Sequence, residues 1–579
     1  MKKLLSYLRP YRASVAFALV LVFVQSISEL LLPALMAEIV DRGVVRGDTG
    51  LILRSGVLML FVALAGAACN ILSAFYSSKV SMAFGRDLRL ELFSRVESFS
   101  AREFDAIGVS TLITRTTNDV SQIQNFLIMA LRLLARAPLM AIGGLIMALY
   151  TDARLSLVLV VALPLLAASV ALVSAKGMPL FRRMQDRIDA LNLVLREGLT
   201  GIRVVRAFNR LETERVRFRA ANEELRRTSL SAQRIMTVLM PVMMILMNLT
   251  TVAVVWFGGL RVDAGAIQVG DLMAFVQYAM QILFSMMMLS AMFAMYPRAS
   301  ISADRVAEVL ETSSSIRDPE RAPASAEPLP ERSGRIEFRN VSFRYPGAEE
   351  YALRDVSFSV AAGETTAIIG GTGSGKTTLV SLLLRFYDAE SGSVQVDGRD
   401  VREFRQEELR ARMGYAPQKA HLFSGTVADN IRFGAPDAGM DEVRSAAEAA
   451  QARDFISELP LGYETAVAQG GTNFSGGQRQ RISIARVLAR RPEICVFDDS
   501  FSALDFTTDA RLRAALAERP ADAAVLIVAQ RIATIRNADR IVVLDEGKVA
   551  GIGTHGSLLA DCPVYREIAS SQLSTEESA

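Results

Sequence analysis

Hydrophobic residues gather in the first half of the chain, where they form six long runs separated by polar segments. A helix needs roughly 20 mostly apolar residues to cross a bilayer, and each run reaches that length. The pattern therefore predicts a membrane all-α six-helix domain over residues 1–310. The six runs are Val15 to Ile39, Val57 to Tyr76, Leu131 to Tyr150, Leu155 to Ala175, Ile235 to Leu260 and Leu272 to Tyr296.

The connections between the runs predict how the helices are oriented. Only Thr151–Arg154 separates the third run from the fourth, which indicates a short external turn, whereas the second-to-third and fourth-to-fifth connections are long and rich in arginine. Lysine and arginine mark the cytoplasmic side of a membrane protein. Lys2, Lys3, Arg9 and Arg12 agree with that side. We therefore expect a multi-pass protein of the plasma (bacterial inner) membrane with cytoplasmic amino and carboxyl termini.

The pattern changes after the sixth run. Residues 311–334 are rich in Ser, Pro, Glu and Arg without periodicity, which is typical of a linker. Residues 335–579 alternate strand-like and helix-like segments and form the second predicted domain, an α/β P-loop domain.

One motif in this second domain predicts nucleotide binding. It follows a strand-like run, Thr365 to Ile369, and opens a helix-like one, Thr378 to Phe386, as a P-loop requires. Its glycines let backbone N–H groups surround phosphates at a helix N-terminus. Lys376 is expected to contact the β- and γ-phosphates, and Thr377 and Asp498 to reach Mg²⁺. The candidate residues are Gly370, Gly371, Thr372, Gly373, Ser374, Gly375, Lys376, Thr377 and Thr378.

A further motif, Asn473–Arg481, resembles the signature of ABC ATPases, with Phe474 where leucine is commonest. With the six-span domain before it, the chain resembles an ABC exporter half-transporter of the multidrug and lipid-flippase type. The resemblance implies ATP and Mg²⁺ as cofactors. It assigns Tyr345 to adenine stacking, Gln418 to Mg²⁺ and Asp505 to a loop at the dimer interface. In this family Ser475, Gly476, Gly477 and Gln478 serve the ATP of a second chain, so a partner half-transporter is expected.

Two positions depart from the family. Asp499 stands where the general base is normally glutamate, and Gln530 stands where the family has histidine. Aspartate is one methylene shorter, and glutamine cannot carry a proton charge. Together they predict a degenerate ATP site beside an intact signature, the pattern of one subunit in a heterodimeric exporter. A homodimer with slow hydrolysis, or a regulatory or ATP-gated channel subunit, stays open.

The membrane runs contain candidate residues for the transport path. Methionines crowd the fifth and sixth runs and fit either a changeable cavity for amphipathic cargo or ordinary gap filling. Polar residues within a span are expected to face a cavity or a neighbouring helix. Two of them, Arg132 and Arg136, would match an anionic amphiphile. The candidates are Arg132, Arg136, Asn248, Gln277 and Gln281.

Charge and cysteine content exclude other classes. The net charge of +3 gives no support for nucleic acid as a partner. The three cysteines, Cys69, Cys495 and Cys562, lack metal-site spacing. The predicted function is therefore ATP-driven export of amphipathic small molecules, lipids or peptides across the plasma membrane, as the subunit that contributes a degenerate ATP site and an intact signature to a heterodimer, with the cargo unspecified.

Overall fold

The computed structural model describes residues 2–319, 334–517 and 523–576. The chain divides into two compact units, one holding Met1–Glu97 with Ser110–Thr312 and the other holding Ser98–Val109 with Ser313–Ala579. Most of the predicted linker, residues 320–333, lies outside the described residues. The short segment Ser98–Val109 groups with the second unit although it lies between two membrane-type helices in sequence.

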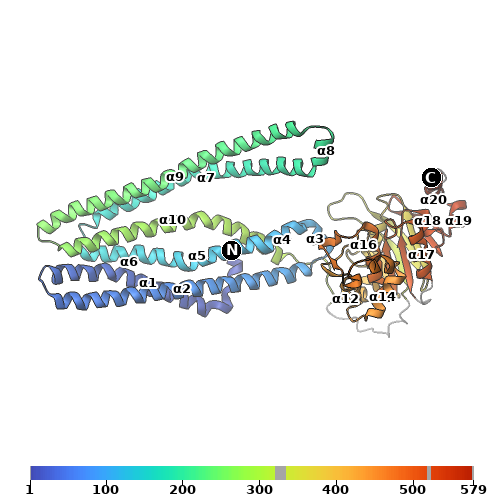
Figure 1. The fold of residues 1–579 in the computed structure, drawn as a ribbon, viewed down its shortest axis with the longest axis horizontal. Coiled ribbons are helices and arrows are strands. Elements are labelled where there is room, and N and C mark those ends of the chain that lie inside the picture. Colours follow the sequence, from blue (N-terminus) through green and yellow to red (C-terminus); the bar gives the residue numbers. More distant parts are fainter. Residues whose placement is uncertain (1, 320–333, 518–522, 577–579) are drawn as a thin grey trace. The chain divides into compact units, whose positions relative to one another are not determined.

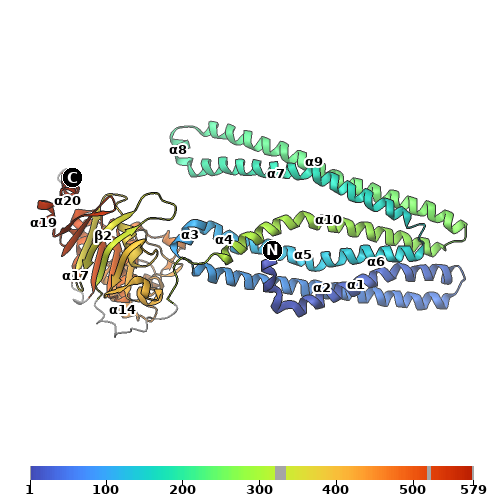
Figure 2. The same cartoon turned by 180° about the vertical axis from the view of Figure 1, so that it is seen from behind.

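The first unit consists of long helices, and among the described residues six helical segments are long and apolar enough to cross a membrane. This confirms the predicted six-helix domain. Figures 1 and 2 show α7 and α9 side by side, with the short α8 at their turn. The elements are η1 (Lys2–Tyr11), α1 (Arg12–Glu38), η2 (Ile39–Val44), α2 (Thr49–Glu97), α4 (Val109–Thr114), η3 (Arg115–Asp119), α5 (Val120–Met129), η4 (Ala130–Leu134), α6 (Ala135–Thr151), α7 (Leu157–Thr200), α8 (Ile202–Ala207), α9 (Leu211–Asp263) and α10 (Val269–Glu311).

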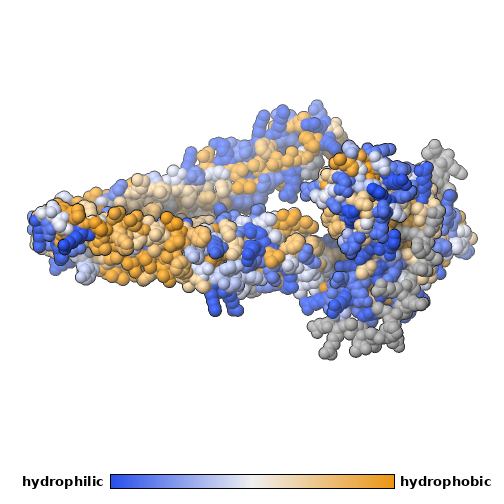
Figure 3. All heavy atoms as spheres, turned by 60° about the horizontal axis from the view of Figure 1, so that its bottom comes forward, coloured by the Kyte–Doolittle hydropathy of each residue, from blue (hydrophilic) through white to orange (hydrophobic). Residues whose placement is uncertain are grey.

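The surface of the helical unit is apolar because its neighbours are lipids. Figure 3 shows hydrophobic residues gathered over this unit beside a hydrophilic tip. Large side chains such as Phe61, Leu64 and Trp256 are more than 60% exposed, which is costly in water but favourable in hydrocarbon. A membrane is therefore the medium in which this unit is stable.

The turn between α6 and α7 is as tight as predicted. Asp152 Oδ1 accepts a hydrogen bond from the Leu155 backbone N–H at 2.8 Å. Its Oδ2 accepts two more from Arg261 at the end of α9, at 3.0 and 2.6 Å. Because the Asp152 side chain is only 4% exposed, this ion pair ties the hairpin to α9.

The second unit is built on a six-stranded sheet in the order β12-β11-β3-β10-β9-β6, in which only the edge strand β12 is antiparallel. A four-stranded antiparallel sheet, β2-β1-β4-β5, and a short pair, β7-β8, complete it. The strands are β1 (Ile336–Phe343), β2 (Leu353–Val360), β3 (Thr365–Gly370), β4 (Ser391–Val396), β5 (Arg399–Asp400), β6 (Met413–Ala416), β7 (Gly425–Thr426), β8 (Ala466–Val467), β9 (Ile494–Asp498), β10 (Ala524–Val528), β11 (Arg540–Asp545) and β12 (Lys548–Gly553).

Helices between and around these strands make the unit α/β, as predicted. They are α3 (Ala101–Ile107), α11 (Lys376–Leu383), η5 (Val401–Glu403), α12 (Gln406–Ala411), α13 (Val427–Arg432), α14 (Met440–Ala449), α15 (Arg453–Ser457), η6 (Gly462–Glu464), η7 (Gln469–Gly471), α16 (Gly476–Arg490), α17 (Phe506–Ala517), α18 (Ile532–Ile535), α19 (His555–Asp561) and α20 (Pro563–Glu576).

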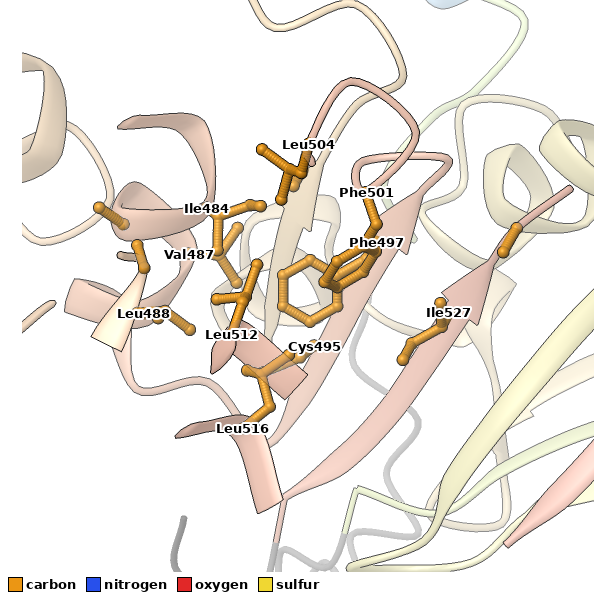
Figure 4. Packing of buried hydrophobic residues seen from close by; sticks show 14 of the residues in the cluster. Ile484, Val487, Leu488, Cys495, Phe497, Phe501, Leu504, Leu512, Leu516 and Ile527 are labelled. Carbon is orange, nitrogen blue, oxygen red and sulfur yellow. The ribbon is translucent and has the colours of Figure 1, made fainter. Parts of the chain in front are cut away.

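The core lies on both faces of the six-stranded sheet because side chains alternate along each strand. In β9, Cys495 and Phe497 enter the cluster on one face, while Ile494 and Val496 enter the cluster on the other. Figure 4 shows the first cluster, where Phe497 meets Phe501 with ring centroids 5.4 Å apart. This packing anchors the loop that begins at Asp499.

Candidate functional site

Four parallel strands carry the candidate residues to one edge of the sheet. The strands β3, β10, β9 and β6 are neighbours, and their carboxyl ends meet at the same edge. The P-loop follows β3, Asp498 ends β9, Gln530 follows β10 and Gln418 follows β6. Residues more than a hundred positions apart in sequence therefore converge, which is the usual position of a ligand site in an open α/β sheet.

The P-loop is shaped to receive phosphates. Gly373 and Gly375 have φ of 82° and 96°, which suits glycine. A Cβ on Gly375 would lie 2.7 Å from the Ala352 carbonyl oxygen. Lys376 Nζ donates to the carbonyls of Gly370 and Gly371 at 2.9 and 2.7 Å. Burial lowers the pKa of Lys376, opposed by the charges of Asp499 and Asp498. A buried cation inside a ring of backbone groups fits a polyphosphate.

The residues predicted for Mg²⁺ lie together. Thr377 Oγ1 donates to Asp498 Oδ1 at 3.2 Å. Asp498 is 1% exposed, and its Oδ2 is buried with no hydrogen-bond partner among the described residues. Burial raises the pKa of Asp498, partly offset by the Thr377 hydrogen bond. A buried carboxylate oxygen without a partner is costly. A hydroxyl and a carboxylate are also the hard oxygen ligands that Mg²⁺ prefers, so the pair fits this ion.

Asp499 is held by the two glutamines that sequence analysis singled out. Gln418 Nε2 and Gln530 Nε2 donate to the same oxygen, Asp499 Oδ2, at 3.3 and 3.2 Å. Burial raises the pKa of Asp499, while the Gln418 hydrogen bond and the charge of Lys376 lower it. One oxygen of this carboxylate, Oδ2, is thus already an acceptor for two neutral amides.

The backbone fixes Asp499 as firmly as its side chain. Its N–H donates to the Val528 carbonyl at 2.9 Å, and Ser500 Oγ donates to the Ala416 carbonyl at 2.8 Å. Asp499 has φ of 49°, a left-handed conformation that aspartate tolerates better than most residues. The carboxylate therefore cannot advance toward a substrate without breaking these contacts.

Gln572 on α20 clamps the loop that carries Gln530. Its Nε2 donates to the Gln530 carbonyl at 2.7 Å, and its Oε1 accepts from the Ile532 N–H at 2.8 Å. The clamp holds both sides of Arg531. Sequence analysis did not find Gln572, because no local pattern marks a contact between residues about forty positions apart.

The predicted signature forms the N-terminus of α16. Ser475 Oγ accepts from the Gln478 N–H at 3.2 Å, and Gln478 Oε1 accepts from the Ser475 N–H at 2.9 Å, a reciprocal capping box. Ser475 and Gly476 are exposed. A Cβ on Gly477 would lie 3.0 Å from the Ala503 carbonyl. Among the described residues, no hydrogen bond links this turn to the P-loop.

Asp505 follows the loop beside the signature. Its carboxylate accepts from the Thr508 N–H at 2.9 Å and from the Thr508 hydroxyl at 2.7 Å. These bonds lower the pKa of Asp505, the backbone bond most. The side chain thus caps α17 within its own chain.

Tyr345, predicted to stack on adenine, belongs to an aromatic group beside the P-loop helix. Its hydroxyl lies 3.0 Å from Thr378 Oγ1, and its ring meets the Tyr387 ring at 5.5 Å. Tyr387 in turn donates to Asp105 on α3 at 2.6 Å. Burial and this hydrogen bond raise the pKa of Tyr387. The group connects the P-loop helix to the segment between α2 and α4.

Family models match both halves of this architecture. The ABC transporter transmembrane region matches residues 15–286, and the ABC transporter model matches residues 353–502. The chain belongs to the ABC transporter family. It is a half-transporter, with one membrane domain and one ATP-binding domain, and its ATPase is coupled to transport. The predicted family and fold class are confirmed.

Related proteins and a solved structure are also ABC transporters. An ABC transporter ATP-binding protein of Mycobacterium tuberculosis is 46% identical over 98% of this chain and 97% of its own. A fatty acid ABC transporter ATP-binding/permease protein of the same species is 34% identical over 83% of this chain and 75% of its own. A bacterial Atm1-family ABC exporter with ATP bound shares 26% identity and a TM-score of 0.80, covering 97% of this chain and 98% of that one. The fold is that of an ABC exporter.

Two of the five path candidates come together in the helical unit, and a third lies nearby. Arg136 Nη2 lies 2.7 Å from Glu29 Oε2 on α1, and Gln281 Nε2 donates to the Glu29 carbonyl at 3.3 Å. Gln277 lines a cavity of about 430 Å³ between α1 and α10. Arg132 has no hydrogen bond or ion pair among the described residues.

Asn248 on α9 is exposed and makes no described hydrogen bond to these side chains. Sequence analysis missed Glu29, although it is the one carboxylate in the middle of the first apolar run, whose other carboxylate, Glu38, lies at its end.

The methionines divide between the two roles considered. Met243, Met247, Met286 and Met287 pack with Leu166 and Leu283 in a core between helices. Met273 and Met280 line the cavity beside Gln277. Methionine therefore fills gaps in one place and lines open space in another.

Proposed function

We propose that the chain exports amphipathic molecules across the plasma membrane as one subunit of a heterodimer. It would contribute a slow ATP site and an intact signature helix. The observation that carries this proposal is the carboxylate of Asp499, which is bridged by two neutral amides. A base that is short, fixed and already hydrogen-bonded is poorly placed to activate water.

Each residue of the site has a role in this proposal. Tyr345 stacks on the adenine, the amides around Gly373 and Gly375 surround the phosphates, and Lys376 pairs with their negative charge. Thr377, Gln418 and Asp498 hold Mg²⁺, which when bound neutralises phosphate charge. Thr378 continues the helix that supports the loop. Asp499 and Gln530 orient a water without removing its proton efficiently.

The signature helix serves a different ATP. Its exposed N-terminus, at Ser475 and Gly476, presents backbone N–H groups and a positive dipole end to an anion. No described hydrogen bond joins it to its own P-loop, so its natural ligand is the γ-phosphate held by a partner chain. ABC exporters act as dimers, and an unequal pair would place one good site beside one slow site. Bound ATP that is not cleaved stabilises the closed pair by mass action.

The proposed function also assigns a task to each domain of the chain. Residues 1–310 span the bilayer, 311–334 link the domains and 335–579 bind the nucleotide. Both termini face the cytoplasm, because the arginine-rich connections lie on that side. The cargo is amphipathic, and the resemblance to a fatty acid transporter supports a lipid-like molecule.

Purification of the complex tests the unequal pairing. A tagged copy of the chain is extracted from its native membrane in mild detergent and its subunits are identified by mass spectrometry. We expect one copy of this chain with one copy of a different half-transporter that has glutamate and histidine at the two departing positions. A complex of two identical chains would refute the heterodimer and favour a slow homodimer.

A further inference from the structure

The polar cluster inside the helical unit carries an uncompensated charge. The six apolar runs contain four charged side chains, namely Glu29, Glu38, Arg132 and Arg136. Glu38 lies at the end of α1 and pairs with Arg42 at 3.7 Å, so it is not part of this cluster. Glu29 pairs with Arg136, and Arg132 lies one helical turn away on η4, so these three side chains have a net charge of +1. Arginine stays protonated in any protein environment, and a charge within a bilayer is costly unless it is paired. The cluster therefore favours a further anion.

The depth of the cluster is set by the helices. Fifteen residues separate Arg136 from Thr151 at the end of α6, which is about 22 Å at about 1.5 Å per residue. The helix of Glu29 continues through η2 to Val44, fifteen residues further on, which is the same end of the bundle because Gly270 N–H donates to Asp41 Oδ1 there. The hydrocarbon layer is about 30 Å thick, so Arg136 and Glu29 fall within that length, whereas Arg132, about 28 Å from Thr151, lies near its inner limit.

Pro33 explains why the cluster forms on α1. Proline has no N–H, so the carbonyl of Glu29, four residues earlier, loses its helical hydrogen bond. The Gln281 amide donates to that carbonyl instead, at 3.3 Å. Gln281 Oε1 is buried without a partner among the described residues. Gln25 Nε2 donates to Glu29 Oε1 at 2.9 Å, which fixes the carboxylate that faces Arg136.

Arg132 lies on a wider π-helical turn, η4, one turn from Arg136. Such turns are frequent at functional sites. The turn packs against α1 and α10, the two helices that carry Glu29 and Gln281. The Arg132 side chain is partly buried there, with no partner among the described residues. Glu29 neutralises only Arg136, so the positive charge of Arg132 is not balanced within the cluster.

An apolar cavity lies along α1 and α10, the two helices that carry Glu29 and Gln281. The cavity of about 430 Å³ lies between α1 and α10, and six of its lining residues are Pro33, Met36, Met273, Val276, Gln277 and Met280. Gln277 lines the cavity and lies four residues before Gln281, on the same face of α10, so the polar cluster and the cavity share that face. The volume falls within the roughly 300–1,000 Å³ of small-molecule sites. Its methionines can adapt to an alkyl chain.

We propose that Arg132 and Arg136 bind the acidic headgroup of a single-chain amphiphile whose alkyl chain enters this cavity. The carboxylate of Glu29 competes with this headgroup for Arg136. This inference rests on the proposed export function and names its substrate class, a carboxylate or phosphate on an alkyl chain. Because Arg132 lies further than the cavity from the outer end of the bundle, the headgroup points toward the cytoplasm. That is the orientation of a molecule entering from the inner leaflet.

Binding measurements without ATP test the proposal. The native complex is placed in phosphatidylcholine nanodiscs and titrated with palmitate, 1-palmitoyl-lysophosphatidate and hexadecanol, which separate a carboxylate, a phosphate and a neutral headgroup. We expect at least one anion to bind at least tenfold more tightly than hexadecanol. Arg132→Gln and Arg136→Gln should each weaken that anion at least fivefold. Arg154→Gln, which removes an exposed arginine of the α6–α7 turn, is the matched control and should change nothing.

The Glu29→Gln variant is the decisive test, because it should change the anion affinity in the opposite direction to the arginine variants. Glutamine keeps the size of the side chain and an acceptor for Arg136 but removes the competing charge, so the anion should bind at least threefold more tightly. A misfolded variant cannot produce that gain. Equal binding of anions and hexadecanol, wild-type affinity in both arginine variants, or weaker binding in Glu29→Gln would each overturn the proposal.

The outcome is separable from that of the proposed function. A complex that exports cargo with ATP yet binds neither anion would refute only the acidic substrate class. A complex that binds palmitate through Arg136 but never releases it with ATP would refute only the export function.

Discussion

The double substitution Asp499→Glu with Gln530→His tests why the ATP site is slow. Asp499 is fixed by the Val528 carbonyl and bridged by Gln418 and Gln530, so its carboxylate cannot advance. Glutamate moves the carboxylate forward by one C–C bond, roughly 1.5 Å. Histidine removes one amide from the acceptor oxygen and supplies a group that can carry charge.

The expected gain follows from the geometry of proton transfer. A misplacement of about 1 Å costs on the order of a hundredfold in rate. Correcting both side chains should therefore raise turnover at this site about a hundredfold, equivalent to about 2.7 kcal/mol in the barrier. The left-handed backbone at position 499 opposes the change, because glutamate tolerates φ of 49° less well than aspartate. A loss of about 1 kcal/mol would lower the melting temperature by about 2–4 °C.

The assay is phosphate release by the native complex. The partner's catalytic glutamate is replaced by glutamine, so that the measured phosphate comes only from the ATP site of this chain. Asp437→Glu, the same change in an exposed loop of the same unit, is the control and should leave both rate and melting temperature unchanged. A rise of less than threefold in the double variant would refute the view that these two side chains limit turnover.

Three further changes probe the parts around this site. Lys376→Ala should weaken ATP binding by this chain at least a hundredfold, measured by equilibrium binding, because it removes the cation within the P-loop; unchanged affinity would contradict the assigned role. Ser475→Arg should leave that binding intact but reduce turnover of the complex at least a hundredfold, because arginine blocks the signature helix; loss of this chain's own ATP binding instead would count against a site shared between chains. Tyr387→Phe removes the 2.6 Å hydrogen bond to Asp105 and should leave basal ATP turnover within twofold while reducing its stimulation by cargo at least threefold; full stimulation would show that α3 is not coupled through this contact.

Much of the architecture follows from sequence because its causes are local. Apolar runs specify the six spanning helices, and the glycines around Lys376 specify the phosphate loop. Asp498 and Gln530 converge because parallel strands bring their carboxyl ends to one edge. The contacts that set reactivity were not predictable in this way. The bridge of Gln418 and Gln530 on one oxygen of Asp499 depends on how three loops pack, and no residue pattern encodes it.

Ion pairs between distant residues of the helical unit could not be predicted from the sequence either. Glu29 and Arg136 are 107 positions apart, and only packing of α1 against α6 reveals that they form an ion pair. The same holds for Ser98–Val109, which groups with the nucleotide-binding unit although it is flanked by helices of the membrane unit. Periodicity identifies helices, but it does not identify their neighbours.

The most direct measurement is ATP turnover by the purified chain alone in lipid nanodiscs at saturating ATP and Mg²⁺. We predict that the chain binds ATP through Lys376 and hydrolyses it at about 0.1 per second or less, a hundredfold below the common enzyme rate of about 10 per second. Turnover near 10 per second, lost in Lys376→Ala, would contradict the account, because the bridged carboxylate of Asp499 would then be an adequate base.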